Sequence, residues 1–161
     1  SSLSRDMLPM FEFLLSSGVR VSELCSLNIR QVNLEDRTAR VIGKGNVERM
    51  ILFSNYCKEV LNNYLSFRRD GNESLFLNKR GRRLTPNATW KRISKLGRNV
   101  LSRRIYPHLF RHTFATYLLD GGSTLAEVKE LLGHSQISTT SVYVHPTAAI
   151  KERYDKAIEK I

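Results

Sequence analysis

The sequence predicts an α+β fold: a mostly helical domain with a small three-stranded antiparallel sheet at one edge. Most of the chain repeats its apolar residues at spacings of three and four, as amphipathic helices do, whereas 32–53 carries short β-type runs between turn sequences. The length of 161 residues and the hydrophobic content of 41% are enough for a domain with its own core. No repeat, low-complexity tract or long linker interrupts the pattern, so we expect a single domain over 1–161.

The N-terminal part of the chain predicts two helices that meet at an arginine. Residues 3–17 carry an apolar stripe at helical spacing, and Gly18 is a typical helix stop. A second helix begins near Val21 and runs to about Leu27. Arg20 is therefore expected at the junction between the two helices.

The three predicted strands follow these helices. They cover 32–34, 38–42 and 49–53, and the turn residues between them are 35–37 and 43–46. Three short strands are too few to be stable by themselves, so the sheet is expected to pack on the helices.

After the strands, helices alternate with polar turns. Residues 56–69 predict a helix and 75–77 a short strand, and a basic turn follows at 79–83. Thr85 is a typical helix cap and Pro86 suits the first helical position, so the next helix is expected to begin there.

The C-terminal third predicts four more helical segments. The first begins at Pro107, and the second runs from Thr124, which fits a capping box, to a stop at Gly133. A short turn of helix is expected at 138–143, and an amphipathic tail at 148–161.

The charge of the chain indicates a polyanionic partner. Lys and Arg number 26 against 15 Asp and Glu, which gives a formal net charge of +11 and a pI near 10.1. Such an excess favours nucleic acid first and an anionic membrane surface second. No apolar run approaches the roughly 20 residues of a membrane span, and the start of the sequence shows no signal-peptide pattern. We expect no membrane partner.

The cysteines and histidines favour neither a disulfide framework nor a metal site. Cys25 and Cys57 each fall inside an amphipathic pattern, which is typical of reduced core residues and suggests a cytoplasmic location. No pair of Cys or His at ligand spacing has a second pair to complete a zinc site. We expect no metal and no cofactor.

The helix that begins at Pro107 combines features of an anion site. His108 and Arg111 stand at i and i+3 on one face of it. A helix N-terminus offers free N–H groups and partial positive charge, so a guanidinium beside it favours an anion. We interpret that anion as a DNA phosphate.

Polar residues at other element junctions have simpler explanations when each is taken alone. An arginine after a helix stop is usually a surface charge, a lysine between glycines a solvated turn residue, and a tyrosine a packing residue. These junction residues are Arg20, Lys44, His108, Arg111, His134 and Tyr143.

Their order along the chain, however, resembles a known family. The motifs are Gly18-Val19-Arg20-Val21-Ser22-Glu23-Leu24, Gly43-Lys44-Gly45, His108-Leu109-Phe110-Arg111-His112-Thr113-Phe114-Ala115-Thr116, Leu131-Leu132-Gly133-His134 and Thr139-Thr140-Ser141-Val142-Tyr143-Val144-His145. Together they closely resemble the tyrosine recombinase, or phage integrase, family of the Xer type. The resemblance covers nearly the whole chain, and these separate motifs are unlikely to arise together by chance.

The resemblance implies a role for each of these residues. Tyr143 would be the nucleophile, Arg20 and Arg111 the arginine pair, and Lys44 the hairpin lysine. His108 and His134 would be the two imidazoles. Glu23 resembles the family's acidic residue beside the first arginine, and His145 is left as a structural or supporting residue.

The chemistry implied is cleavage and rejoining of DNA through a 3′-phosphotyrosyl link. Two planar guanidiniums can hold the charged nonbridging oxygens of the five-coordinate state without a metal. A tyrosine with a pKa near 10 needs a base, for which we choose His108, and His134 would hydrogen-bond the phosphate. Lys44 is expected to protonate the leaving 5′ oxygen.

The resemblance also sets expectations for partners and domains. The partner would be a double-stranded DNA recombination site, and four protomers would act together as a homo-tetramer. The tail 148–161 would either pack on a neighbouring protomer or fold back on its own core. Relatives usually carry an N-terminal domain of roughly 100 residues, which is absent here, so we expect 1–161 to be the catalytic domain and favour a fragment.

Two rival functions remain open at this stage, and so do the DNA contacts. One rival is a catalytically silent DNA-binding regulator, and the other is a DNA-relaxing enzyme similar to type IB topoisomerases. The residues expected to contact DNA are Lys79, Arg80, Arg82 and Arg83 in the basic turn and Lys91, Arg92, Lys95 and Arg98 on the following helix. The alternative for these residues is a solvated basic face.

Overall fold

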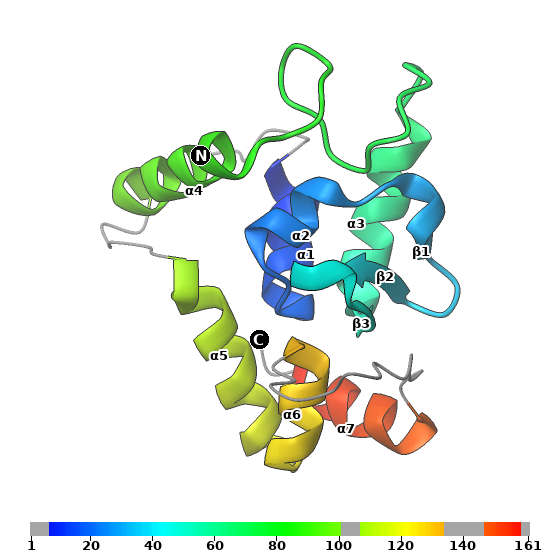
Figure 1. The fold of residues 1–161 in the computed structure, drawn as a ribbon, viewed down its shortest axis with the longest axis vertical. Coiled ribbons are helices and arrows are strands. Elements are labelled where there is room, and N and C mark those ends of the chain that lie inside the picture. Colours follow the sequence, from blue (N-terminus) through cyan, green and yellow to red (C-terminus); the bar gives the residue numbers. More distant parts are fainter. Residues whose placement is uncertain (1–6, 101–106, 134–146, 159–161) are drawn as a thin grey trace.

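The computed structural model describes residues 7–100, 107–133 and 147–158, with the backbone alone for Val100, Pro107 and His108 (Figure 1). The elements follow in the order α1 (Met7–Ser17), α2 (Val21–Ser26), η1 (Ile29–Gln31), β1 (Val32–Asn33), β2 (Thr38–Ile42), η2 (Lys44–Asn46), β3 (Glu48–Leu52), α3 (Asn55–Ser66), α4 (Pro86–Val100), α5 (Pro107–Asp120), α6 (Leu125–Leu132) and α7 (Ala148–Ile158). The labels η1 and η2 denote short 3-10 helices. The predicted α+β class is confirmed.

The three strands form one antiparallel sheet in the order β1-β2-β3, as predicted. Its register pairs Ala39 with Ile51 and Val41 with Arg49. Ala39, Val41 and Ile51 are almost fully buried, so this face of the sheet meets the core. Arg49 shares the face with its cross-strand partner Val41 and with Ile51, two residues further along the same strand.

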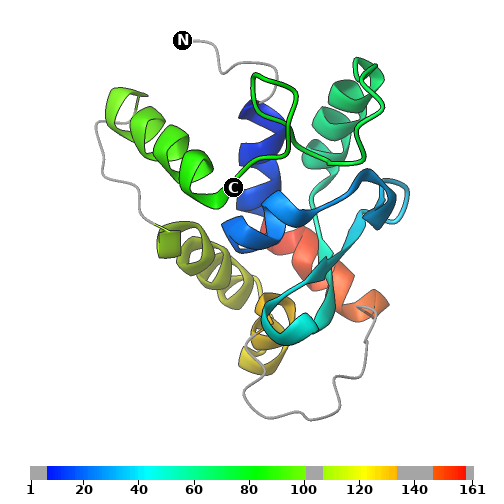
Figure 2. The same ribbon diagram turned by 45° about the horizontal axis from the view of Figure 1, so that its top comes forward.

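Helix α1 lies at the centre of the molecule, between α3, α5 and the sheet (Figures 1 and 2). Its side chains Phe13 and Leu14 are at most 1% exposed. Gly18 ends the helix with a φ of +70°, and a Cβ there would lie 2.4 Å from the Phe114 ring of α5. The close approach of α1 to α5 therefore requires a glycine at this position.

The buried residues form two hydrophobic clusters. The first gathers α1, α2, β2, α3 and α4, and the second gathers α5, α6 and α7 with Leu52 of β3. Helix α5 reaches both, because Phe110 packs in the first cluster and Phe114 in the second.

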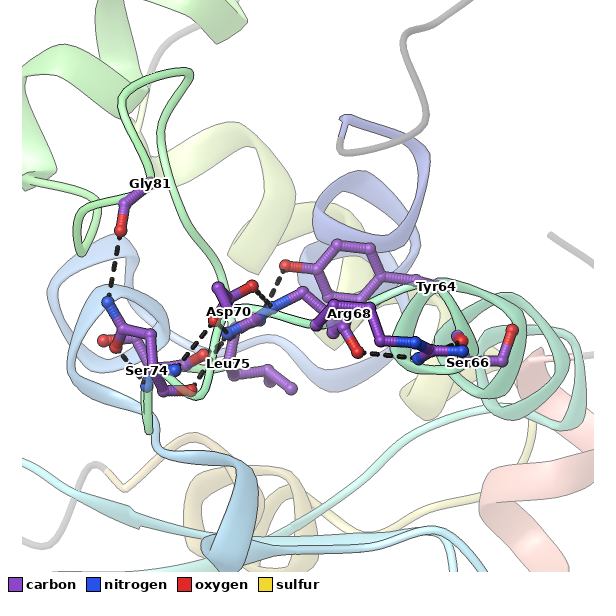
Figure 3. Close-up of polar contacts among 9 residues, drawn as sticks. Tyr64, Ser66, Arg68, Asp70, Ser74, Leu75 and Gly81 are labelled. Atoms are coloured by element: carbon purple, nitrogen blue, oxygen red, sulfur yellow. Dashed lines mark hydrogen bonds and ion pairs between the residues drawn. The ribbon is translucent and has the colours of Figure 1, made fainter.

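Arg68 binds several main-chain carbonyls of the loop after α3, beside the two backbone hydrogen bonds that the loop makes with 27–29 (Figure 3). The guanidinium of Arg68 donates to the carbonyls of Asn72, Ser74 and Leu75 at 2.9–3.0 Å. It also pairs with Asp70 at 2.6–2.8 Å, and this arginine holds the pKa of the Asp70 carboxyl down, at about 2.

The strand predicted at 75–77 is wrong. The structure has only isolated bridges here, between Asn28 and Ser74 and between Leu77 and Arg83. Leu75 is fully buried. The apolar residues at 75–77 therefore reflect a loop that packs against the core, not a strand in a sheet. The helix predicted at 56–69 is α3, which begins at Asn55 after the cap Ser54 and ends at Ser66. The helical turn predicted at 138–143 lies outside the described residues.

Helix α7 packs on its own chain. Tyr154, Ala157 and Ile158 are buried in the second cluster. Asp155 accepts two hydrogen bonds of 2.8 Å from Arg37, in the turn between β1 and β2. Arg153 likewise pairs with Glu127 of α6 at 2.7 and 3.0 Å. In this structure the amphipathic tail, as far as Ile158, folds back on its own core.

Replacing Tyr154 by Phe is expected to lower the free energy of unfolding by about 1–2 kcal/mol. The Tyr154 hydroxyl donates to Ser16 O at 2.5 Å, and that carbonyl belongs to the last turn of α1, where no helix partner exists. Urea denaturation measures the change. The control is Tyr56→Phe, because Tyr56 is 52% exposed. An equal loss in the two variants would contradict this account.

Candidate active site

Arg20 sits where α1 gives way to α2, and Glu23 fixes it there. Arg20 is the N-cap of α2, and its backbone N–H donates to Glu23 Oε1 at 2.9 Å. The Arg20 guanidinium Nη1 lies 3.8 Å from Glu23 Oε2, and the side chain is 40% exposed. Glu23 therefore holds the main chain of Arg20 in place, while the Arg20 side chain still reaches solvent.

Glu23 is a buried carboxylate, with a side chain only 2% exposed. Burial of a carboxylate is unfavourable unless it is paired and hydrogen-bonded. Its main partner is Arg49, whose Nη2 donates to Glu23 Oε1 at 3.0 Å and whose Nη1 pairs with Oε2. A Cβ on Gly43 would lie 3.1 Å from Oε2, so the carboxylate also packs against the base of the β2–β3 hairpin.

Arg49 is a site residue that sequence reasoning missed. The prediction placed it in a strand and gave it no function. The available signal was the alternation of β3, which puts Arg49 on the same face as Ile51. A charged residue on the core face of a strand needs a buried partner, and here that partner is Glu23.

Arg111 comes from α5 and is half-buried. Its Nη2 donates to Leu132 O, in the last turn of α6, at 2.6 Å, and its buried Nε has no hydrogen-bond partner among the described residues. Burial first, and then the nearby charges of Arg20 and Arg49, lower the pKa of Arg111 to about 10, while Glu23 opposes this shift. The guanidinium remains protonated at neutral pH.

Lys44 lies at the tip of the hairpin, in η2 between β2 and β3. It is exposed, and it directly follows Gly43, the residue that packs on Glu23. Gly45 and Asn46 then adopt positive φ angles of 75° and 59°, which turn the chain into β3. The turn that carries Lys44 therefore begins at the residue that lies against the Glu23 carboxylate.

A hollow of about 260 Å³ opens beside the two guanidiniums. Arg20 and Arg111 lie on its wall, together with apolar side chains that include Trp90 of α4 and Phe110 of α5. The site therefore has an apolar side as well as a cationic one.

The remaining predicted site residues lie partly or wholly outside what the structure describes. His108 is the second residue of α5, one turn before Arg111, with its backbone alone described. His134, Tyr143 and His145 lie outside the described residues. Among the residues that are described, no group of three or more His, Cys, Asp or Glu side chains could hold a metal ion. Within those ranges, no helix has the length and apolarity to cross a bilayer.

The basic residues predicted to contact DNA fall into two kinds. Lys79, Arg80 and Arg82 are exposed on a turn that the Asn78 side chain closes. Arg83 differs, because its Nη1 donates to Cys25 O and Leu27 O at 3.0 and 3.1 Å. Its guanidinium is thus bound to the end of α2.

The following helix, α4, presents its own basic residues. Lys91, Lys95 and Arg98 are exposed, and Arg92 is partly buried. The loop and α4 are continuous in sequence, and both lie in the upper part of Figure 1.

The charges at the centre of the site favour an anion. Three guanidiniums (Arg20, Arg49 and Arg111) surround one carboxylate, Glu23, which leaves two positive charges uncompensated within this group. Arg111 carries an unused donor, and Arg20 is solvent-accessible. This arrangement can hold an oxyanion through planar donors.

Relatives of the chain are recombinases. It is 41% identical over 153 residues to the tyrosine recombinase XerC of Histophilus somni, and 41% identical over 154 residues to the tyrosine recombinase XerD of Oceanobacillus iheyensis. These alignments cover 92% and 90% of this chain and 52% of each relative. The chain thus spans about half the length of these proteins.

Solved structures agree with the sequence relatives. The XerA recombinase matches with a TM-score of 0.78 and 28% identity, covering 92% of this chain and 56% of that one. The XerH site-specific recombinase, in a pre-cleavage complex with its difH substrate, matches with a TM-score of 0.67 and 26% identity over 94% of this chain and 47% of that one.

The family match covers most of the chain. Residues 2–149 fit the phage integrase family, and they include every junction residue named above. With relatives at this identity and structures of this similarity, the chain belongs to the phage integrase family.

Proposed function

We propose that this chain is the catalytic domain of a site-specific DNA recombinase that cleaves and rejoins strands through a 3′-phosphotyrosyl intermediate. The observation that carries the proposal is the pair of guanidiniums from α2 and α5, Arg20 and Arg111, gathered around Glu23 with surplus positive charge. The identity to XerC and XerD supports the same activity.

The proposed reaction exchanges one phosphate ester for another. The Tyr143 hydroxyl oxygen attacks the scissile phosphorus, and the bond from phosphorus to the 5′ oxygen breaks. His108 accepts the phenol proton, and Lys44 gives a proton to the leaving 5′ oxygen. The ester link is retained, so a 5′ hydroxyl from another strand can reverse the step without an external energy source.

The cationic residues act on the charge that develops in this reaction. Extra negative charge appears on the nonbridging oxygens of the five-coordinate state, where Arg20 and Arg111 would hold them. Burial makes the Arg111 charge more effective, because it is poorly screened by water. His134 would add a hydrogen bond to the phosphate, and His145 a supporting contact near Tyr143.

The proposed partner is a double-stranded recombination site bound by a homo-tetramer. The net charge of +11 favours DNA, and XerH was solved with its difH substrate. We assign DNA contacts to Lys79, Arg80, Arg82 and the basic face of α4. We keep Arg83 out of this set, since its guanidinium holds the end of α2. The segment 148–161 is proposed to contribute to the tetramer through the face of α7 that does not pack on its own core, which includes the exposed Glu152 and Lys156.

The two rival functions are less well supported. A catalytically silent regulator could bind phosphate through the same arginine pair, but it would have no need for the nucleophile Tyr143 or the proton donor Lys44. A topoisomerase-like enzyme shares the chemistry, but the similar proteins reported above are recombinases.

Tyr143→Phe is expected to abolish a covalent protein–DNA adduct. The substrate is a random-sequence library of nicked duplexes. After cleavage, the short fragment between the cleaved bond and the nick diffuses away, so the covalent link cannot be reversed. Denaturing electrophoresis detects the adduct, and sequencing its junctions identifies the target site. Tyr56→Phe, at an exposed tyrosine, should form the adduct normally. Absence of any wild-type adduct would contradict the proposed function.

Inorganic phosphate is expected to stabilise the wild-type protein more than the variant Arg111→Met. Near neutral pH the charge of Arg111 is uncompensated, so its site attracts an anion. An anion that binds the folded protein but not the unfolded one stabilises the folded protein. At about ten times its Kd, phosphate should add about 1.4 kcal/mol. Thermal unfolding with and without phosphate measures this. Arg40→Met, at an exposed arginine of β2, should respond like the wild type. Equal responses from all three proteins would contradict an anion site at Arg111.

Lys44→Ala is expected to slow adduct formation by about 10²–10⁴-fold, the usual contribution of a general acid. A substrate with sulfur in place of the leaving 5′ oxygen should remove most of this loss, because a thiolate leaves without a proton. Single-turnover cleavage of both substrates is the measurement. Lys91→Ala, a proposed DNA contact, should gain nothing from the sulfur substrate. An equal defect of Lys44→Ala on both substrates would contradict the general-acid role.

A further inference from the structure

We propose that Arg49 is a positioning residue that sets the geometry between the two anion-binding guanidiniums, Arg20 and Arg111. The inference rests on the proposed function, but no family motif quoted above contains Arg49. It follows from what Arg49 joins.

Arg49 connects α2 to α6 through three groups of its guanidinium. Its Nη1 and Nη2 both bind the Glu23 carboxylate, and its Nε donates to Leu131 O at 3.1 Å. The side chain is only 11% exposed, so these contacts are shielded from water. A guanidinium is planar and presents its donors in a fixed fork, which makes such a link rigid.

The C-terminal turn of α6 is the anchor that Arg49 shares with Arg111. Arg49 binds Leu131 O, and Arg111 binds the next carbonyl, Leu132 O, at 2.6 Å. Carbonyls at a helix C-terminus lack helix partners and carry partial negative charge, so they suit guanidiniums. A continuous chain of contacts therefore runs from Arg111 through α6, Arg49 and Glu23 to Arg20.

This polar chain crosses between the two hydrophobic clusters. Leu24, beside Glu23, belongs to the first cluster, and Leu131 and Leu132 belong to the second. Catalysis requires the two guanidiniums to be placed within about 0.5 Å of their working positions. Arg49 links the two parts of the fold that carry these guanidiniums directly, through hydrogen bonds.

Gly133 fits the same interpretation. Its φ is +72°, and a Cβ there would lie 2.8 Å from Arg49 Cδ and 2.9 Å from Nε. The turn that ends α6 thus packs directly on the Arg49 side chain.

Because of Arg49, the Glu23 carboxylate mainly neutralises the charge of Arg49 and not that of Arg20. The two contacts of Arg49 occupy the carboxylate, whereas Arg20 Nη1 remains 3.8 Å away, on a side chain that is 40% exposed. Without Arg49, the buried carboxylate would be left to draw the Arg20 guanidinium inward. Arg49 therefore keeps Arg20 available for phosphate.

Arg49→Lys tests the proposal, because lysine keeps the charge but cannot bind Glu23 and Leu131 O with a planar fork. On the nicked duplex recovered from the adduct library, the single-turnover rate at saturating DNA should fall by about 10- to 100-fold. The Kd for the same duplex should change by less than about twofold. Arg40→Lys, at an exposed arginine on the neighbouring strand, should match the wild type.

A methylphosphonate at the scissile position separates positioning from general damage. This substrate lacks the charge of one nonbridging oxygen, so correct placement of the guanidinium that binds that oxygen matters less. The wild-type cleavage rate divided by the Arg49→Lys rate should therefore fall towards one for at least one diastereomer. A merely structural defect would reduce cleavage of both substrates by the same factor, and that result would overturn the proposal. So would a wild-type rate for Arg49→Lys. Thermal unfolding shows whether the variant is folded.

A second variant is available if Arg49→Lys does not fold. The double variant Arg49→Met/Glu23→Gln leaves no unpaired buried carboxylate, and it should show the same loss of rate and the same methylphosphonate response. A wild-type rate here would overturn the positioning role. Failure of the wild type to form any adduct would instead overturn the proposed function, so the two failures are distinguishable.

Discussion

The buried carboxylate of Glu23 is the interaction on which the rest of the site depends. It accepts the backbone N–H of Arg20, pairs with the guanidinium of Arg49 and packs against Gly43. The start of α2, the third strand and the hairpin that carries Lys44 therefore meet at one side chain. A buried charge is tolerated only when its partners are in place, so correct assembly of these three elements is coupled to satisfaction of this carboxylate.

The site concentrates like charges, and the fold tolerates this. Arg111 is half-buried near two other arginines, and burial and repulsion both lower its pKa. Its buried Nε has no partner in the described structure. Residues held in such unfavourable states are typical of functional sites, where stability is given up for chemistry. The two hydrophobic clusters on either side supply the rigidity that keeps these cations together.

Sequence patterns predicted the elements well and the contacts between them poorly. Periodicity and caps located the sheet and the helices in the described ranges, and the Thr124 cap is present as expected. The strand at 75–77 failed because apolar residues bury equally well in a loop: Arg68 binds the carbonyls of Ser74 and Leu75, and the pairing with 27–29 stops at an isolated bridge. The link from Arg49 to Glu23 spans 26 positions, and no local pattern specifies such a pairing.

The way Arg68 holds the loop after α3 has a consequence for how such a protein can change. Arg68 grips main-chain carbonyls of Asn72, Ser74 and Leu75, and every amino acid provides a carbonyl. Asp70 and Asn72 accept main-chain N–H groups of the same loop, so the path of its backbone depends on these two side chains as well as on Arg68. The exposed side chains of Lys79 and Arg80 take no part in these contacts, so they can be exchanged, in evolution or by an engineer, while the backbone that displays them keeps its course.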